Sequence, residues 1–72
     1  MSSFKQDIIE MLTIAFNKSI TSTINDNYSD DNPQEIYDLA HSMLTKLEGS
    51  KNASKKLSLI LNRYPEININ EI

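Results

Sequence analysis

The sequence contains no cysteine and no tryptophan, and it has one glycine, one histidine and two prolines among its 72 residues. Without cysteine the chain can form neither a disulfide nor a zinc site with thiolate ligands. A phosphate-binding loop needs several glycines in a short stretch, so a single glycine excludes that motif. The composition thus removes two ways of stabilising a small domain and one common nucleotide-binding device.

Long hydrophobic runs are also missing from the sequence. No stretch approaches the roughly 18 apolar residues that a membrane span requires. The N-terminal segment lacks the basic region, apolar core and small-residue cleavage site of a secretory signal. We therefore expect a cytoplasmic protein without a membrane partner.

Positive charge is scarce, since ten acidic residues outnumber seven basic ones and give a formal net charge of −3. Binding to nucleic-acid phosphates depends on an excess of Lys and Arg, so this balance argues against nucleic acid as the partner. The charges are also unevenly distributed. Four bases lie close to the C-terminus (Lys51, Lys55, Lys56 and Arg63), and five acids lie in the middle of the chain (Asp26, Asp30, Asp31, Glu35 and Asp38).

The short chain length limits the stability of the fold. A domain of this size buries only about 60% of its unfolded surface and gains about 3–5 kcal/mol of net stability. Because disulfides and thiolate zinc sites are excluded, association with another chain is the remaining way to gain stability. We predict a homodimer.

Residues 8–16 form the densest apolar stretch, in which only Glu10 and Thr13 are polar. Ser3 and Gln6 form a capping box just before it, which predicts a helix over residues 4–24. β-Branched and small residues lower the helix propensity after position 19, so we expect this helix to fray toward its end.

The apolar residues of this first helix fill an arc of about 180° when successive residues are placed 100° apart, which is wide enough to contact two neighbours. The arc holds Phe4, Ile8, Ile9, Met11, Leu12, Ala15, Phe16 and Ile20, and the opposite side holds Gln6, Asp7, Glu10 and Asn17. Ile14 falls among the polar residues. The wide arc is explained either by the core of the domain or by an interface along the first helix.

A second helix is predicted over residues 33–48. Asn32 occupies the N-cap position, Pro33 the first helical position, and Glu35 follows three residues after the cap. Gly49 stands where helices commonly end in a residue with positive φ.

A third helix is predicted over residues 52–64, because Pro65 disfavours helical geometry at the residue before it. Residues 65–72 then alternate apolar and polar side chains. A lone strand has no partner in a helical domain, so we expect this segment to lie on the outside of the helices. The predicted fold class is all-α: residues 1–72 form one small three-helix antiparallel domain that dimerises through its first helix, with an extended C-terminal tail.

His41 is the only histidine, and no nucleophile of a known signature accompanies it. It could act as a base or metal ligand oriented by Asp38, or it could be a boundary residue hydrogen-bonded to a neighbour. A catalytic or metal site needs several convergent groups, so we favour the second interpretation. We predict no enzymatic activity, no catalytic residue, no metal and no cofactor.

Two apolar residues, Ile14 and Leu59, lack an obvious core position and lie among charged neighbours. We therefore predict that the protein regulates others by protein–protein contact, as an adaptor, connector or inhibitor. The predicted partner-binding residues are Phe4, Met11 and Ile14 on the first helix, and Lys55, Leu59 and Arg63 on a second surface. The alternative is a DNA-binding transcriptional regulator that uses the basic face of the third helix.

The segment Ile36-Tyr37-Asp38-Leu39-Ala40-His41-Ser42-Met43, followed by a helix ending in Leu61-Asn62-Arg63-Tyr64, resembles the YmgB/AriR group of small bacterial biofilm and stress regulators. The resemblance covers the C-terminal half of the chain. It implies a dimeric, all-helical connector protein in signalling. Residues 57–68 are also similar to the end of some phage-repressor-type DNA-binding domains, but the recognition helices of that family have no counterpart upstream.

Overall fold

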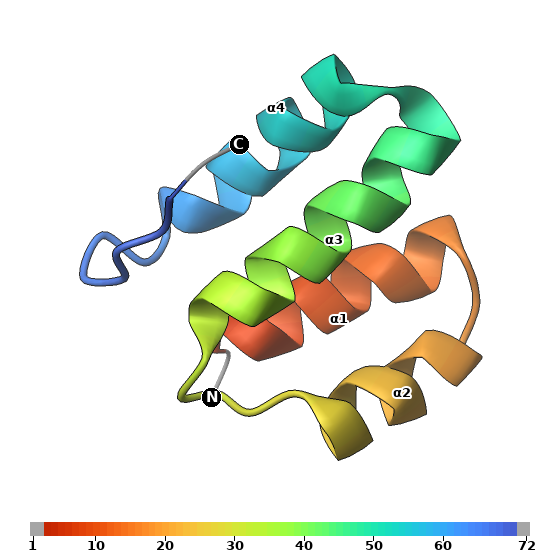
Figure 1. Ribbon diagram of the computed structural model, residues 1–72, viewed down its shortest axis with the longest axis horizontal. Coiled ribbons are helices and arrows are strands. Elements are labelled where there is room, and N and C mark those ends of the chain that lie inside the picture. The colour runs from red at the N-terminus through yellow and green to blue at the C-terminus, as the bar shows by residue number, and fades with distance from the viewer. Residues whose placement is uncertain (1–2, 71–72) are drawn as a thin grey trace.

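The computed structural model describes residues 3–70, which form four α-helices and no strand (Figure 1). The helices are α1 (Phe4–Ala15), α2 (Ser19–Asn27), α3 (Pro33–Glu48) and α4 (Ser50–Leu61). The all-α class predicted from the sequence is confirmed, and the prediction of three helices is wrong.

The additional helix arises because the predicted first helix, residues 4–24, is broken after Ala15. The side-chain oxygen of Asn17 accepts hydrogen bonds from the Ser19 backbone N–H, at 2.9 Å, and from the Ser19 hydroxyl. These bonds satisfy donors that would otherwise be unpaired at the start of a new helix. The chain turns there, and α2 folds back so that Ile24 is fully buried.

The start of α1 agrees with the capping box, since the Ser3 hydroxyl oxygen accepts a hydrogen bond of 3.1 Å from the Gln6 backbone N–H. Phe4, Ile8, Ile9 and Leu12 of the predicted apolar arc are buried, and Ile14 lies outside the buried face. Phe16, which was placed on the same arc, is instead 38% exposed. The prediction fails for Asp7, which was placed on the polar side but is only 7% exposed. The cause is a contact with residues near the C-terminus, described below with the functional site.

Helix α3 has the predicted bounds, Pro33–Glu48. Asn32 stands at the N-cap position, although its side chain makes no capping hydrogen bond. Gly49 ends the helix with a φ of 90°, a backbone conformation that glycine adopts without the steric cost of a Cβ atom. The same glycine is the N-cap of α4, so one residue joins the two helices.

Helix α4 begins earlier and ends earlier than the predicted range of 52–64. It starts at Ser50 because Gly49 completes the turn by itself, without a separate loop. Beyond Leu61, the backbone N–H groups of Arg63 and Tyr64 bond to carbonyls three residues back, at 3.0 and 2.9 Å. This tightening ends the α-helix before Pro65 is reached.

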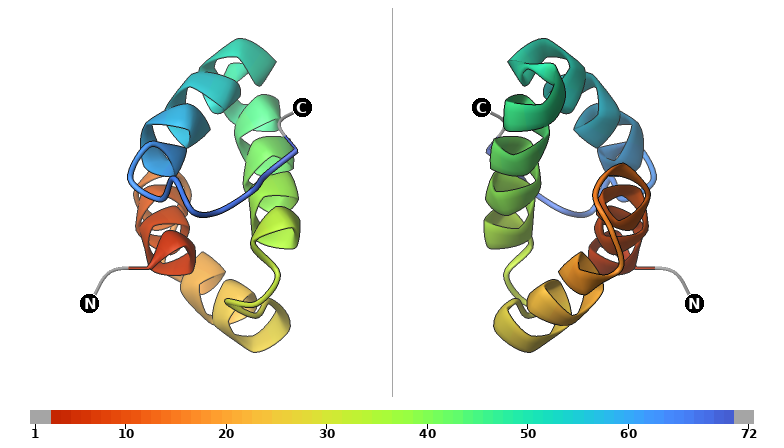
Figure 2. Two further views of the ribbon diagram at one scale, coloured as in Figure 1. Left: turned by 90° about the vertical axis from the view of Figure 1, so that its left-hand side faces the viewer. Right: turned by 90° about the vertical axis from the view of Figure 1, so that its right-hand side faces the viewer.

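The helices enclose a single core. In Figure 2, α1 and α4 lie together on one side of the molecule, α3 lies on the other, and α2 closes one end. Every helix contributes to the buried apolar cluster, which contains Phe4, Ile8, Ile9, Leu12, Ile24, Ile36, Tyr37, Ala40, Leu44, Ala53, Leu57 and Ile60.

The segment after α4 crosses to the first turn of α3 (Figure 2). The side-chain amide of Gln34 makes two hydrogen bonds with the backbone of Asn70, accepting from its N–H at 2.7 Å and donating to its carbonyl at 3.1 Å. Ile67 and Ile69 are partly buried against the core. Of the predicted tail, residues 65–72, the last two lie outside the described part of the chain.

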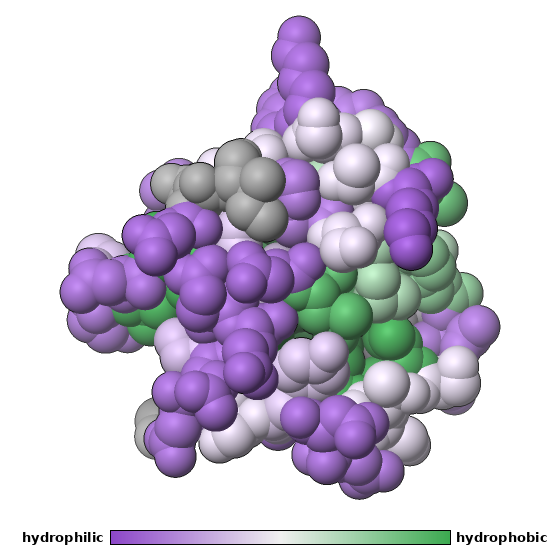
Figure 3. Space-filling view, in the orientation of Figure 1, coloured by the Kyte–Doolittle hydropathy of each residue, from purple (hydrophilic) through white to green (hydrophobic). Residues whose placement is uncertain are grey.

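The surface seen in Figure 3 is largely hydrophilic, and hydrophobic atoms appear there in patches near the centre and right. Four large apolar side chains are exposed among residues 3–70, namely Ile14, Phe16, Leu47 and Leu59. Scattered exposure of this kind is normal, so these residues suggest function only where they gather at one place.

Candidate functional site

Two of the exposed apolar residues, Ile14 and Leu59, line one groove between α1 and α4, which we call the α1/α4 groove. The two helices run in opposite directions (Figure 1), and the groove between them has a volume of about 390 Å³. Met11, Ala15 and Ile60 provide further apolar lining. Ile14 is 88% exposed and Leu59 is 62% exposed, so most of the apolar surface of both side chains remains in contact with solvent.

Charged residues of opposite sign flank this apolar lining. Asp7 and Glu10 stand on the α1 side, and Lys56 and Arg63 stand on the α4 side of the groove. Lys56 forms an ion pair of 2.9 Å with Glu48 at the end of α3. Glu10 is exposed and forms no ion pair with any residue from 3 to 70. The groove therefore combines an apolar centre with one acidic and one basic edge.

Asp7 links the beginning of α1 to the segment after α4. Its Oδ2 atom accepts a 2.8 Å hydrogen bond from the Tyr64 hydroxyl and lies 3.4 Å from Nη1 of Arg63. The Tyr64 ring also meets the Phe4 ring edge to face, with centroids 6.1 Å apart. These contacts bury the carboxylate and hold one end of the α1/α4 groove together.

The environment of Tyr64 changes its acidity. Desolvation raises the pKa of Tyr64, and its hydrogen bond to Asp7 and the negative charge of that carboxylate raise it further. A phenolate beside a carboxylate would place two negative charges together, so the neutral hydroxyl is favoured. Tyr64 thus acts as a donor to Asp7 throughout the neutral pH range.

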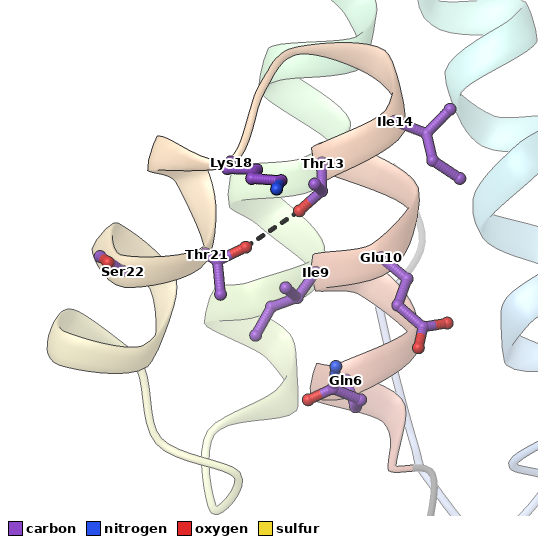
Figure 4. Close-up of a pocket in the computed structure, with 8 residues that line it drawn as sticks. All are labelled: Gln6, Ile9, Glu10, Thr13, Ile14, Lys18, Thr21 and Ser22. Carbon is purple, nitrogen blue, oxygen red and sulfur yellow. Dashed lines mark hydrogen bonds between the residues drawn. The ribbon is translucent and has the colours of Figure 1, made fainter.

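A second groove lies between α1 and α2, with a volume of about 600 Å³ (Figure 4). The hydroxyls of Thr13 and Thr21 are 3.0 Å apart and form a hydrogen bond between the two helices. Ile14 borders this groove as well as the α1/α4 groove. In Figure 4 its side chain points away from α2 and toward the side occupied by α4, so we assign it to the α1/α4 groove.

His41 is buried between α3 and α4 and is only 7% exposed. Its Nε2 atom lies 3.2 Å from the Ser54 hydroxyl oxygen, and its Nδ1 atom lies 3.4 Å from that of Thr45. Asp38 is exposed and instead accepts a hydrogen bond from Gln34. His41 is therefore bonded to neighbouring hydroxyls, as expected of the structural interpretation, and Asp38 does not orient it.

Residues 3–70 provide neither a metal-binding cluster nor a membrane-spanning helix. Within residues 3–70, no group of three His, Asp or Glu side chains is placed to hold a metal ion. No helix in this range combines the length and the apolar character that crossing a membrane requires. No protein-family model, curated protein or solved structure matches the chain.

The residues predicted as contacts are distributed unevenly around the α1/α4 groove. It brings together four of them, Met11, Ile14, Leu59 and Arg63, which the sequence had assigned to two separate surfaces. Phe4 is 4% exposed and belongs to the core, because the Tyr64 ring covers it. Lys55 is exposed on α4 but does not line the groove.

Sequence reasoning missed the charged edges of the groove, since Asp7, Glu10 and Lys56 were not among the predicted contact residues. Each is an ordinary charged residue on an amphipathic helix. Their relation depends on α1 and α4 packing side by side, which the periodicity of either helix does not reveal. The concentration of bases in the last helix was the only available signal.

Proposed function

We propose that the protein is a small non-enzymatic regulator that acts by protein–protein contact through the α1/α4 groove. The observation that carries this proposal is the placement of the two most exposed large apolar side chains, Ile14 and Leu59, at one groove. Burial of one such side chain at an interface contributes about 1.5–3 kcal/mol to the free energy of binding. Two of them supply a hydrophobic centre, and charged edges of the kind found here give specificity.

A catalytic role has less support. The sole histidine is held by two hydroxyl groups inside the helical domain, at 3.2 and 3.4 Å, and faces a buried contact between α3 and α4. The resemblance of residues 36–64 to the YmgB/AriR group points in the same direction, since it implies a connector protein. We therefore expect His41→Ala to affect stability more than function.

The alternative is DNA binding through Lys55, Lys56 and Arg63. Two of these three bases are already paired with acids, Lys56 with Glu48 and Arg63 with Asp7, which lowers the positive charge available to phosphates. A mobility-shift titration with random duplex at low salt tests this alternative. Binding that weakens steeply with added salt and is lost on replacing Lys55 and Lys56 by Glu would favour DNA over protein.

The proposed function is tested by comparing two substitutions of exposed apolar residues, Ile14→Glu inside the groove and Leu47→Glu outside it. Leu47 is 53% exposed on the last turn of α3, so it provides a matched control. Each variant, once circular dichroism shows that it is folded, is immobilised and exposed to extract of the host. Captured proteins are then identified and quantified by mass spectrometry.

We expect wild type and Leu47→Glu to capture the same specific protein and Ile14→Glu to lose it. Capture that is equal for all three proteins would contradict the assignment of the contact surface to the α1/α4 groove. Loss of capture with Leu47→Glu alone would move the surface to the end of α3.

A further inference from the structure

We infer that the occupant of the α1/α4 groove is a second copy of this chain, related to the first by a two-fold axis that runs along the groove. This inference rests on the proposed function, because it uses the same groove as a protein-binding surface. It adds the identity of the partner and the pairing of residues across the interface.

The charges at the edges of the groove are arranged so that a second copy can complement them. Acidic residues, Asp7 and Glu10, stand on the α1 edge, and basic residues, Lys56 and Arg63, stand on the α4 edge. A two-fold axis along the groove places α1 of one copy over α4 of the other. Each acidic edge then faces a basic edge, and the match occurs twice because the interface is symmetric. A groove with edges of one sign would instead repel its own copy.

Three of these four charges, those of Glu10, Lys56 and Arg63, remain accessible to a partner, whereas Asp7 is only 7% exposed. Glu10 is exposed and has no ion pair within residues 3–70. The side chains of Lys56 and Arg63 are 47% and 69% exposed although each has an internal partner. Both can therefore contact a second carboxylate without breaking the ion pair that they already make.

The exposed apolar residues of the groove also suit a second copy. Ile14 projects from α1 and Leu59 from α4, both into the same groove. A two-fold rotation that lays α1 across α4 of the partner turns Ile14 of each copy toward the side of the groove on which Leu59 of the other copy lies. Every large exposed side chain of the groove thereby gains an apolar neighbour. The same operation covers Met11, which is only partly buried in the monomer.

The size of the groove indicates a weak, reversible dimer. Both helices have 12 residues, so the contact runs for about 18 Å at 1.5 Å per residue. A contact of that length buries about 600 Å² per copy, at the lower end of specific interfaces. We expect a dissociation constant on the order of 10 μM, which sets the concentration range of the test.

The test is a charge exchange measured by sedimentation equilibrium. Glu10→Lys places a base on the acidic edge, and Lys56→Glu places an acid on the basic edge. Either variant alone sets like charges against each other at two symmetric positions. Mixed together, the two variants restore opposite charges at both positions of a heterodimer, so only the mixture is expected to associate.

We expect each single variant to dimerise at least about tenfold more weakly than wild type, because two attractive pairs become repulsive. We expect the equimolar mixture to recover most of the lost affinity. The controls are Glu66→Lys and Lys51→Glu, which make the same charge changes at exposed positions outside the groove. Their dissociation constants should stay within about twofold of wild type.

A wild-type protein that stays monomeric up to about 500 μM would overturn the inference. So would single variants that dimerise as tightly as wild type, or a mixture that gains nothing over its components. The proposed function fails separately. If the wild type is monomeric and captures a host protein that Ile14→Glu does not capture, the groove binds a different protein. Only the inference of a second copy is then overturned.

Discussion

Replacement of Ile24 by Ala tests the part of the fold that the sequence pattern did not predict. Ile24 is 0% exposed and is the one buried residue of α2, so it is the main attachment of that helix to the core. Removing most of its side chain forfeits the transfer free energy and leaves a cavity, which together cost about 2–5 kcal/mol. The higher helix propensity of Ala offsets only a few tenths of a kcal/mol. We expect a net loss of about 3 kcal/mol.

This loss is comparable with the total stability of about 3–5 kcal/mol expected for so small a domain. Ile24→Ala is therefore measured in the presence of a stabilising osmolyte, and Ile24→Val provides a milder perturbation of about 1 kcal/mol. The assay is urea unfolding followed by far-UV circular dichroism, at a protein concentration below the dissociation constant expected for the proposed dimer. Ile14→Ala is the control, because its side chain is 88% exposed and should change stability by less than about 0.5 kcal/mol.

The reasoning would be refuted if Ile24→Ala and Ile24→Val both unfolded at the wild-type urea concentration. That result would mean that α2 contributes no packing to the core. A single helix continuing from α1 would then be the better description of residues 4–24.

Three further predictions concern other parts of the fold. Gly49→Ala should cost about 1–2 kcal/mol in urea unfolding, because a φ of 90° strains any residue with a Cβ atom even though the space around it is open. Tyr64→Phe should remove an alkaline loss of stability. The pKa of Tyr64 is raised in the folded state, so its contribution is present below its unfolded pKa of about 10 and is lost as pH rises through the folded value. Wild type should accordingly lose more stability than the variant between about pH 9 and pH 12, and an identical decline in both would contradict the contact with Asp7. Gln34→Ala should release the C-terminal segment and speed amide hydrogen exchange at Asn70, whose N–H is bonded to that side chain at 2.7 Å. Unchanged exchange at this amide would show that the bond does not hold the segment.

Capping residues, proline and glycine in the sequence predicted the helix ends that depend on residues close in sequence. The Asn-Pro sequence at the start of α3 and the glycine after its last residue define both ends of the helix, and the observed bounds Pro33–Glu48 match the prediction. The capping box at Ser3 likewise marks the start of α1. In these places the hydrogen bonds or backbone angles involve residues close in sequence.

The break between α1 and α2 could not be read from the pattern, because Ile20 continues the apolar arc of the preceding helix. What decides the structure is the side chain of Asn17, which pairs with the start of α2, and the burial of Ile24 against distant helices. The burial of Asp7 has a similar cause, since its partners lie 56 and 57 residues later. Periodicity assigns a residue to a face, but it does not specify which distant residue will cover that face.

In the candidate site, too, the individual residues were predictable from the sequence and their arrangement in space was not. Ile14 and Leu59 were found from the sequence, because each interrupts the polar side of an amphipathic helix. That they line one groove follows from the antiparallel packing of α1 against α4, which brings the two helices together across the whole length of the chain. The opposite charges of the groove edges become meaningful only once that packing is known.

The connection between α3 and α4 consists of one residue, Gly49. No loop residue is therefore available there to accommodate a change in chain length. Surface loops usually accept extra residues at small cost, because the entropy of closing a loop grows slowly with its length. Here an added residue must be absorbed by the start of α4, where each position corresponds to a rotation of 100° about the helix axis. A single insertion that shifted the register of α4 would turn Leu57 out of the core and carry Leu59 away from the groove. The spacing between α3 and α4 therefore matters to the proposed binding surface as much as the residues that line it.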